Sequence, residues 1–329
     1  MTLPHRQGPR GPQFFAASES LGEIVEAFCD VDLADAATAC ARTIKVLPTT
    51  SPVLIVHYRS PMASQRGVYK HAVNGMHTRA AALKPSGPVG VVLVRLKPDA
   101  ADRVLGVRPA DLLDASVEIC DIFGDHAAAR LEGRLAGAGS AAARVTCMQG
   151  FLEQRRRPSR LDPLVARAMR AIRRSPAISM RALADRLDIG ERSLQRRFKT
   201  EIGASAKRFA RIERMLQAIA ARRSGADWAD VAHAGGFTDQ AHLIRDFRTF
   251  AGSSPDVFCR RVATDRVQRW NDELASSDFY NTFLTEAATS ASSDFARRRK
   301  HVDRVRPRRS AAQCLQQGDV CLLRTARRR

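Results

Sequence analysis

Four side chains with hydrogen-bonding groups lie at helical spacing in one short segment: Arg192, Gln195, Arg196 and Lys199. At about 100° per residue, all four project from the side of a helix opposite to Leu194 and Phe198. Arginine and glutamine can bond two atoms of a guanine or adenine edge at once in the major groove of DNA. A solvated helix surface has a similar composition, so the surrounding elements decide between the two interpretations.

Two other patterns could support cofactor or metal chemistry. Residues 137–142 match the G-x-G-x-x-A fingerprint of dinucleotide-binding loops, but they follow a helix-like segment instead of a strand. His57, His71 and His77 lie in a strand-rich half, yet no His-x-His or carboxylate spacing supports a metal site. The sequence contains no G-x-S-x-G or Walker motif and no clustered Cys/His nucleophile. We therefore predict no cofactor, no metal ion and no catalytic residue.

The segment that carries the four polar side chains belongs to the first of two similar units. At an offset of 49 residues, seven positions match: Leu194 and Leu243, Arg196 and Arg245, Phe198 and Phe247, Thr200 and Thr249, Gly203 and Gly252, Ser205 and Ser254, Phe209 and Phe258. Upstream the offset is 48, and it aligns Ala184 with Ala232. Each unit is predicted to be a short helix, a tight turn and a longer helix ended by glycine, which is helix-turn-helix geometry.

The second unit offers fewer groups that can contact bases. Its corresponding face has Gln240 at the leading end, followed by Ala241, Ile244, Arg245 and Arg248. Alanine and isoleucine can make only apolar contacts, for example with a thymine methyl group. The helix predicted between the units, residues 205–222, spans roughly 27 Å at 1.5 Å per residue. That length suits two recognition helices about 34 Å apart, which is one turn of DNA.

Charge divides the 329-residue chain unevenly. Residues 1–154 carry 16 Lys and Arg against 15 Asp and Glu, residues 155–261 carry 24 against 11, and residues 262–329 carry 14 against 8. The excess after residue 154 indicates a polyanionic partner, although an arginine-rich surface without a partner has the same composition. We predict an N-terminal sensing or dimerisation domain over 1–154, a double helix-turn-helix domain over 155–261, and a short helix with a disordered basic tail over 262–329.

The front half changes character along its length. Residues 52–58 and 89–96 are rich in β-branched side chains and are separated by turn signals. Helical spacing is expected over 19–28, 110–123 and 127–135. The predicted fold class is therefore an α+β domain followed by an all-α domain.

Composition argues against secreted and membrane-spanning classes. The longest apolar run, Val89–Val94, is too short to span a bilayer, and no apolar segment follows the charged N-terminus. The seven cysteines form no C-x-x-C pair, which is typical of reduced thiols. We predict a cytoplasmic protein with no membrane partner.

Two segments closely resemble the DNA-binding domain of the AraC/XylS family of bacterial transcriptional regulators. They read LADRLDIGERSLQRRFKTEIGASAKRF and DVAHAGGFTDQAHLIRDFRTFAGSSPDVF. The resemblance covers residues 161–261, and Gly236-Phe237, Arg245-x-Phe247 and Gly252-x-x-Pro255 are its most specific part. It implies base contacts by seven residues: Arg192, Gln195, Arg196, Gln240, Ala241, Ile244 and Arg245. The front half resembles the uncharacterised α+β sensor region that precedes this domain in some family members.

Together these patterns predict a sequence-specific transcription regulator that places two recognition helices in successive major grooves of double-stranded DNA. Phosphate contacts are expected from five residues: Lys199, Lys207, Arg208, Arg211 and Arg248. We expect the N-terminal domain to bind a small-molecule effector or a second copy of the chain, with RNA polymerase as a further partner. Two alternatives stay open: an enzyme domain tethered to a DNA-binding module, and a non-specific architectural DNA-binding protein.

Overall fold

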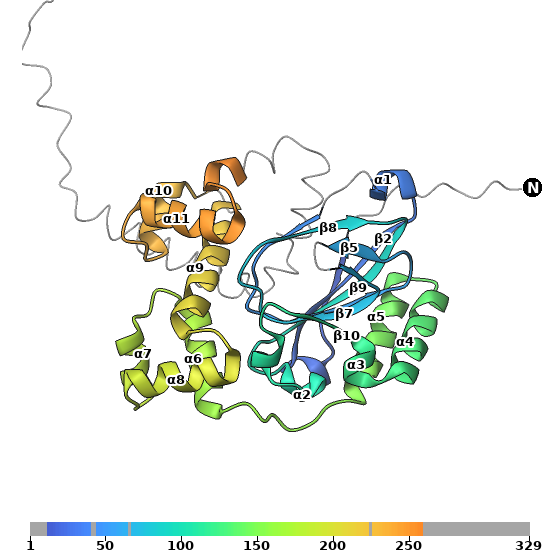
Figure 1. Ribbon diagram of the computed structural model, residues 1–329, viewed down its shortest axis with the longest axis horizontal. Coiled ribbons are helices and arrows are strands. Elements are labelled where there is room, and N and C mark those ends of the chain that lie inside the picture. Colours follow the sequence, from blue (N-terminus) through green and yellow to red (C-terminus); the bar gives the residue numbers. More distant parts are fainter. Residues whose placement is uncertain (1–11, 41–43, 65–66, 224–225, 259–329) are drawn as a thin grey trace, which may run out of the picture.

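The computed structural model describes residues 12–40, 44–64, 67–223 and 226–258. A strand-rich N-terminal domain, which ends with helix α5, is followed by a helical domain that begins with α6 (Figure 1). This arrangement confirms the predicted fold class of an α+β domain followed by an all-α domain. The basic tail predicted over 262–329 lies outside the described residues.

Two antiparallel sheets build the N-terminal domain. The first has six strands in the order β1 (Gln13–Phe15), β2 (Val25–Leu33), β9 (Val89–Leu96), β4 (Val53–His57), β7 (His71–Asn74) and β10 (Ser116–Glu118). The second has four strands in the order β3 (Ile44–Val46), β8 (Ala81–Pro85), β5 (Met62–Ser64) and β6 (Gly67–Tyr69). The two β-branched runs predicted as strands are β4 and β9, at the centre of the larger sheet.

The central strands are buried on both faces. Phe28 of β2 lies opposite Val94 of β9, and both belong to the core shared with the helices of this domain. Val31 lies opposite Val91, and both belong to the core shared with the second sheet. Because neither face meets water, β9 is apolar at nearly every position instead of alternating.

Helices cover the face of the larger sheet that is turned away from the helical domain (Figure 1). They are α3 (Ile119–Phe123), α4 (Asp125–Gly137) and α5 (Ala141–Glu153). The hydroxyl of Ser140 accepts a hydrogen bond from the backbone N–H of Ala143 at 3.2 Å, so it caps α5. The glycine-containing segment 137–142 therefore joins two helices, which is not the strand-to-helix setting of a dinucleotide-binding loop.

Of the helices predicted in the front half, the one over 19–28 is wrong and the one over 110–123 is only partly confirmed. Over 19–28 the chain forms a single 3-10 turn, η1 (Glu19–Leu21), before β2 begins at Val25. Over 110–123 it forms η2 (Pro109–Leu112), then β10 and α3. Sheet pairing overrides the helical spacing in both places. In β2 the strand is buried on both faces, so apolar residues occur at helical intervals too. Two shorter helices complete the domain: α1 (Ala36–Cys40) and α2 (Asp102–Leu105).

Six helices form the helical domain within the described residues: α6 (Pro163–Arg174), α7 (Met180–Arg186), α8 (Glu191–Ile202), α9 (Ala206–Arg223), α10 (Trp228–Ala234) and α11 (Gln240–Ala251). Helix α6 begins after Asp162, because the carboxylate of Asp162 accepts a hydrogen bond from the N–H of Leu164 and Pro163 occupies the first turn. Helix α9 runs between the unit formed by α7 and α8 and the unit formed by α10 and α11 (Figure 1).

The internal repeat is visible in the packing of the two units. Phe198 contacts Phe209 edge-to-face at 5.5 Å between ring centroids, and the matching pair, Phe247 and Phe258, does so at 6.0 Å. The second helix of each unit ends at a glycine in the left-handed region, Gly203 with φ 78° and Gly252 with φ 67°. Matched residues therefore have matched structural roles, which confirms two helix-turn-helix units.

The two terminal glycines give a matched prediction on stability. Gly203→Ala and Gly252→Ala should each lower the free energy of unfolding by about 1–2 kcal/mol, because a Cβ atom is disfavoured in the left-handed region. Gly203→Ala should lower the free energy of unfolding more than Gly252→Ala. A Cβ at position 203 would lie 3.0 Å from the side chain of Leu113, whereas a Cβ at position 252 meets nothing within 4 Å. Urea unfolding of the full chain measures both. Equal losses would contradict the close packing at Gly203.

Candidate nucleic-acid interface

Helix α8 buries one face and exposes the other. Leu194, Phe198 and Ile202 are buried in the core of the helical domain. Arg192, Arg196 and Lys199 are exposed, and Gln195 is half-buried. Among the described residues, the side chains of Arg192 and Arg196 have no hydrogen-bond or ion-pair partner. Their guanidinium groups are therefore available to a partner outside the chain.

A neighbouring arginine holds α8 in place. Arg197 donates a hydrogen bond to the carboxylate of Asp162, the residue that caps α6, at 2.9 Å. Burial acts to raise the pKa of Asp162, but its bonds to the helix N–H groups and to Arg197 hold that pKa below its usual range. Sequence reasoning missed this contact, because nothing in the spacing of residues 162 and 197 indicates that they meet.

Helix α11 repeats the arrangement with a less polar outer face. Its buried side chains are Leu243, Phe247 and Phe250. Of its predicted base-contacting residues, Gln240, Ala241 and Arg245 are exposed and Ile244 is half-buried. Asp239 caps the helix, because its carboxylate accepts a hydrogen bond from the N–H of His242 at 2.6 Å.

Two of the five predicted phosphate-binding residues are engaged within the protein. The guanidinium of Arg208 donates to the hydroxyl of Thr78 at 2.9 Å, and that of Arg211 pairs with the buried carboxylate of Asp246 at 2.7 Å. These contacts reach the N-terminal domain and α11, and the spacing of these residues along the sequence indicates neither of them. Four of the five are exposed, namely Lys199, Lys207, Arg208 and Arg248, and Arg211 is half-buried.

The N-terminal domain touches both helix-turn-helix units. Leu113 packs against Gly203 at the end of α8, and the N–H of Ala80 donates to the carbonyl oxygen of Phe250 in α11 at 3.2 Å. Leu47 and Met76 belong to the same buried cluster as the core of the helical domain. The two recognition helices are therefore supported by one common body in this structure.

A buried network of charges joins the two domains. Arg173 of α6 pairs with Glu26 of β2 at 2.7 Å and with Glu213 of α9 at 3.4 Å. Arg95 of β9 also pairs with Glu26, and Thr50 donates to Glu213. Burial raises the pKa of Glu213, although Arg173 beside it acts in the opposite direction. The sequence gives no sign of this network, since its members lie far apart along the chain.

The histidines considered as metal ligands have other surroundings. His57 contacts the carbonyl oxygen of Lys70 through Nδ1 at 2.6 Å, and burial lowers its pKa to about 4, so the ring is neutral at pH 7. His71 contacts Glu132 through Nε2 at 3.2 Å. Within the described ranges, no group of three or more His, Cys, Asp or Glu side chains could hold a metal ion. In those same ranges no helix combines the length and apolarity needed to cross a membrane.

Two helix-turn-helix units with exposed arginine and glutamine side chains define a DNA-binding class of protein. Residues 183–261 match the family model of a helix-turn-helix domain. This match agrees with the AraC-type helix-turn-helix domain that the sequence of the C-terminal region predicts. Residues 13–118, which run from β1 to β10, match a domain of unknown function, DUF6597.

Structures of ToxT from Vibrio cholerae are among the solved structures that this chain matches. A structure of ToxT at 1.65 Å resolution is 10% identical with a TM-score of 0.42, and the match covers 76% of this chain and 98% of ToxT. A complex of ToxT with (E)-4-(8-methylnaphthalen-1-yl)but-3-enoic acid is 11% identical with a TM-score of 0.40, covering 76% and 98%. ToxT bound to an unsaturated fatty acid is 10% identical with a TM-score of 0.38, covering 77% and 96%. A comparison with curated protein sequences found no significant match.

Proposed function

We propose that this protein is a sequence-specific transcription regulator of the cytoplasm, which places α8 and α11 in successive major grooves of double-stranded DNA. The observation that carries the proposal is the outer face of α8. Arg192 and Arg196 are exposed there, on the side opposite to the buried Leu194 and Phe198. Helix α9, with 18 residues, is roughly 27 Å long and separates the two units by a distance suited to one turn of DNA.

The two recognition helices have unequal roles in this proposal. Helix α8 supplies most of the base discrimination, because Arg192, Gln195 and Arg196 can form paired hydrogen bonds with base edges. Helix α11 supplies Gln240 and Arg245, together with apolar contacts from Ala241 and Ile244. We therefore expect the half-site contacted by α8 to tolerate fewer base changes than the half-site contacted by α11.

The N-terminal domain is proposed to regulate this activity by binding a small-molecule effector or a second copy of the chain. Its contacts with both units support that role, because a change in this domain would alter the support of α8 and α11 together. RNA polymerase is proposed as a further partner of the DNA-bound protein.

Selection from a random duplex library tests the function. The full chain, incubated with the library at fixed salt, should enrich one motif with two half-sites about one helical turn apart. Enrichment of no motif, with similar affinity for every duplex, would overturn sequence-specific regulation and favour a non-specific architectural role. Turnover of a substrate by the chain would favour the alternative of an enzyme tethered to DNA.

Adjacent residues on α9 give a matched prediction on phosphate contact. Lys207→Ala should weaken binding to specific and scrambled duplexes alike and reduce the slope of log affinity against log salt by about one unit. Arg208→Ala should change that slope less, because its guanidinium is held against Thr78 and near the carboxylate of Asp114 within the protein. Titrations at several salt concentrations measure both slopes. A reduced slope for Arg208→Ala alone would reverse the assignment.

A further inference from the structure

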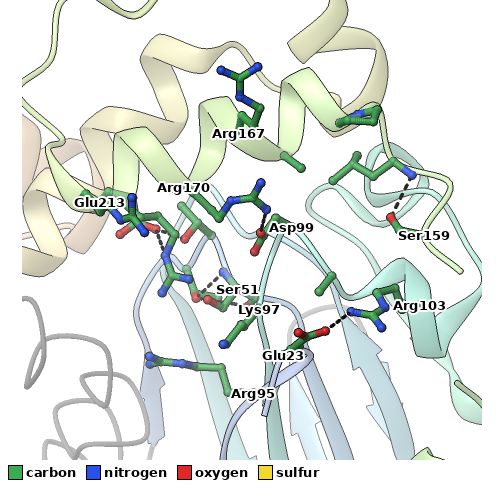
Figure 2. Close-up of a pocket in the computed structure, with 18 of the residues that line it drawn as sticks. Glu23, Ser51, Arg95, Lys97, Asp99, Arg103, Ser159, Arg167, Arg170 and Glu213 are labelled. Carbon is green, nitrogen blue, oxygen red and sulfur yellow. Dashed lines mark hydrogen bonds and ion pairs between the residues drawn. The ribbon is translucent and has the colours of Figure 1, made fainter. Parts of the chain in front are cut away.

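A cavity of about 1070 Å³ lies between the N-terminal domain and the helical domain. The N-terminal domain contributes residues around β9 and α2, the helical domain contributes α6 and α9, and the connecting segment contributes Ser159 (Figure 2). Figure 2 shows Arg170 of α6 reaching Asp99 on one side of this space, and Arg103 reaching Glu23 on another. The cavity therefore spans the boundary between the two parts of the molecule.

The lining of the cavity is strongly basic. Among the described residues, seven Lys and Arg side chains line it against three Asp and Glu side chains. Glu26, which pairs with Arg95 and Arg173 beneath the cavity, brings the acids to four. An excess of three positive charges is left on the lining. Such an excess in a concave, partly buried site favours an anion that carries more than one charge.

Ion pairs near the opening can exchange partners with such an anion. Arg170 pairs with Asp99 at 2.5 Å, and its side chain is 49% exposed. Arg103 pairs with Glu23 at 3.1 Å, and the Glu23 side chain is 79% exposed. One partner of each pair is exposed, while the Asp99 and Arg103 side chains are 11% and 24% exposed, so a phosphate or carboxylate group can compete with the protein's own carboxylates from the exposed side. Guanidinium groups from both domains are thus available to one ligand.

The uncharged lining limits the shape of the ligand. Hydrogen-bonding side chains at Thr50, Ser51, Ser159 and Gln217 border the cavity. Its largest apolar side chains are Leu161 and Leu216, and the described lining includes no aromatic ring. A ligand with a long apolar tail would find little apolar surface to cover here. A compact, polar anion fits this lining better.

We propose that the cavity binds a compact polyanion, a phosphorylated or polycarboxylate small molecule, held by arginines of both domains. The anion site itself is inferred from the cavity alone. Its consequence, the control of DNA binding, rests on the proposed function. A ligand that bridges Arg103 and Arg170 ties the N-terminal domain to α6. It therefore alters how the helix-turn-helix units are supported, which gives the proposed effector a place in the structure.

Calorimetric titration of the full chain tests the site, with sodium pyrophosphate and sodium citrate as probes and sodium decanoate as the singly charged, apolar comparison. We expect one molecule of pyrophosphate or citrate per chain and weaker binding of decanoate. Replacing Arg103 and Arg170 together by glutamine should weaken pyrophosphate and citrate binding at least tenfold. Arg134→Gln, an exposed change on α4 outside the cavity, should have no effect. Thermal unfolding should show that both variants stay folded.

A second variant separates the cavity from the DNA-binding face, which is basic too. Arg196→Gln should leave pyrophosphate and citrate binding unchanged. Loss of binding in Arg196→Gln but not in the Arg103/Arg170 variant would place the anion on α8 and overturn the proposal, as would tighter binding of decanoate than of citrate. Library selection separates failure of the anion site from failure of the proposed function. The wild-type chain should enrich a DNA motif without added anion, whether or not the cavity binds an anion.

Discussion

Arg173→Ala is expected to lower the free energy of unfolding by about 3–5 kcal/mol. The substitution removes the cation between Glu26 and Glu213, both of which are buried, and leaves Arg95 as the nearest remaining partner of Glu26. A buried carboxylate without its partner is costly because water cannot replace the lost interaction. Urea unfolding of the full chain at pH 7 measures the loss.

Arg170→Ala, one turn earlier on α6, is the control for this prediction. Its partner is Asp99, and the Arg170 side chain is 49% exposed whereas that of Asp99 is 11% exposed, so its loss should cost about 1–2 kcal/mol, less than the loss of Arg173. Similar losses for Arg173→Ala and Arg170→Ala would show that burial does not strengthen the interdomain network. Retention of stability by Arg173→Ala would show that the two domains do not depend on that network for their contact.

Arg196→Ala is expected to weaken binding to the selected DNA site by roughly ten- to a hundredfold, or about 1–3 kcal/mol. The loss should be confined to the specific site and should relax the preference at one or two base pairs, as removal of a paired contact with a base would. Binding to a scrambled duplex should change much less. Titration of both duplexes at one salt concentration measures the difference.

Arg134→Ala on α4 provides a charge-matched control, because it removes an exposed arginine from the opposite side of the N-terminal domain. It should leave both affinities unchanged. If Arg196→Ala instead lowered the affinity for both duplexes by the same factor, Arg196 would be a phosphate contact, and the assignment of α8 as the main base-contacting helix would fail.

The helical domain could be predicted in detail because its signals are local. The repeat of leucine, phenylalanine and glycine fixes the core and the helix ends, and Asp162 with Pro163 marks the start of α6. Strands β4 and β9 were equally predictable from their β-branched runs. In each case the residues that define the element lie within it.

The rest depended on contacts between distant parts of the chain. The segment 19–28 has helical spacing, but β2 forms there because β1 and β9 pair with it on either side. Arg208 donates a hydrogen bond to Thr78, which lies 130 residues away in sequence, and no local pattern indicates that contact. The interdomain cavity likewise draws its arginines from both domains, so no short motif could reveal it. The DNA-contacting roles of α8 and α11 stay predictions.

Footprinting of the full chain on the DNA site obtained by selection tests the central claim most directly. Wild-type protein should protect two segments about 10 base pairs apart on one face of the duplex, one for α8 and one for α11. Arg196→Ala should lose protection first at the segment with the stricter base preference. Uniform protection along the duplex, or a single protected segment that is unchanged by Arg196→Ala, would contradict sequence recognition by two helix-turn-helix units.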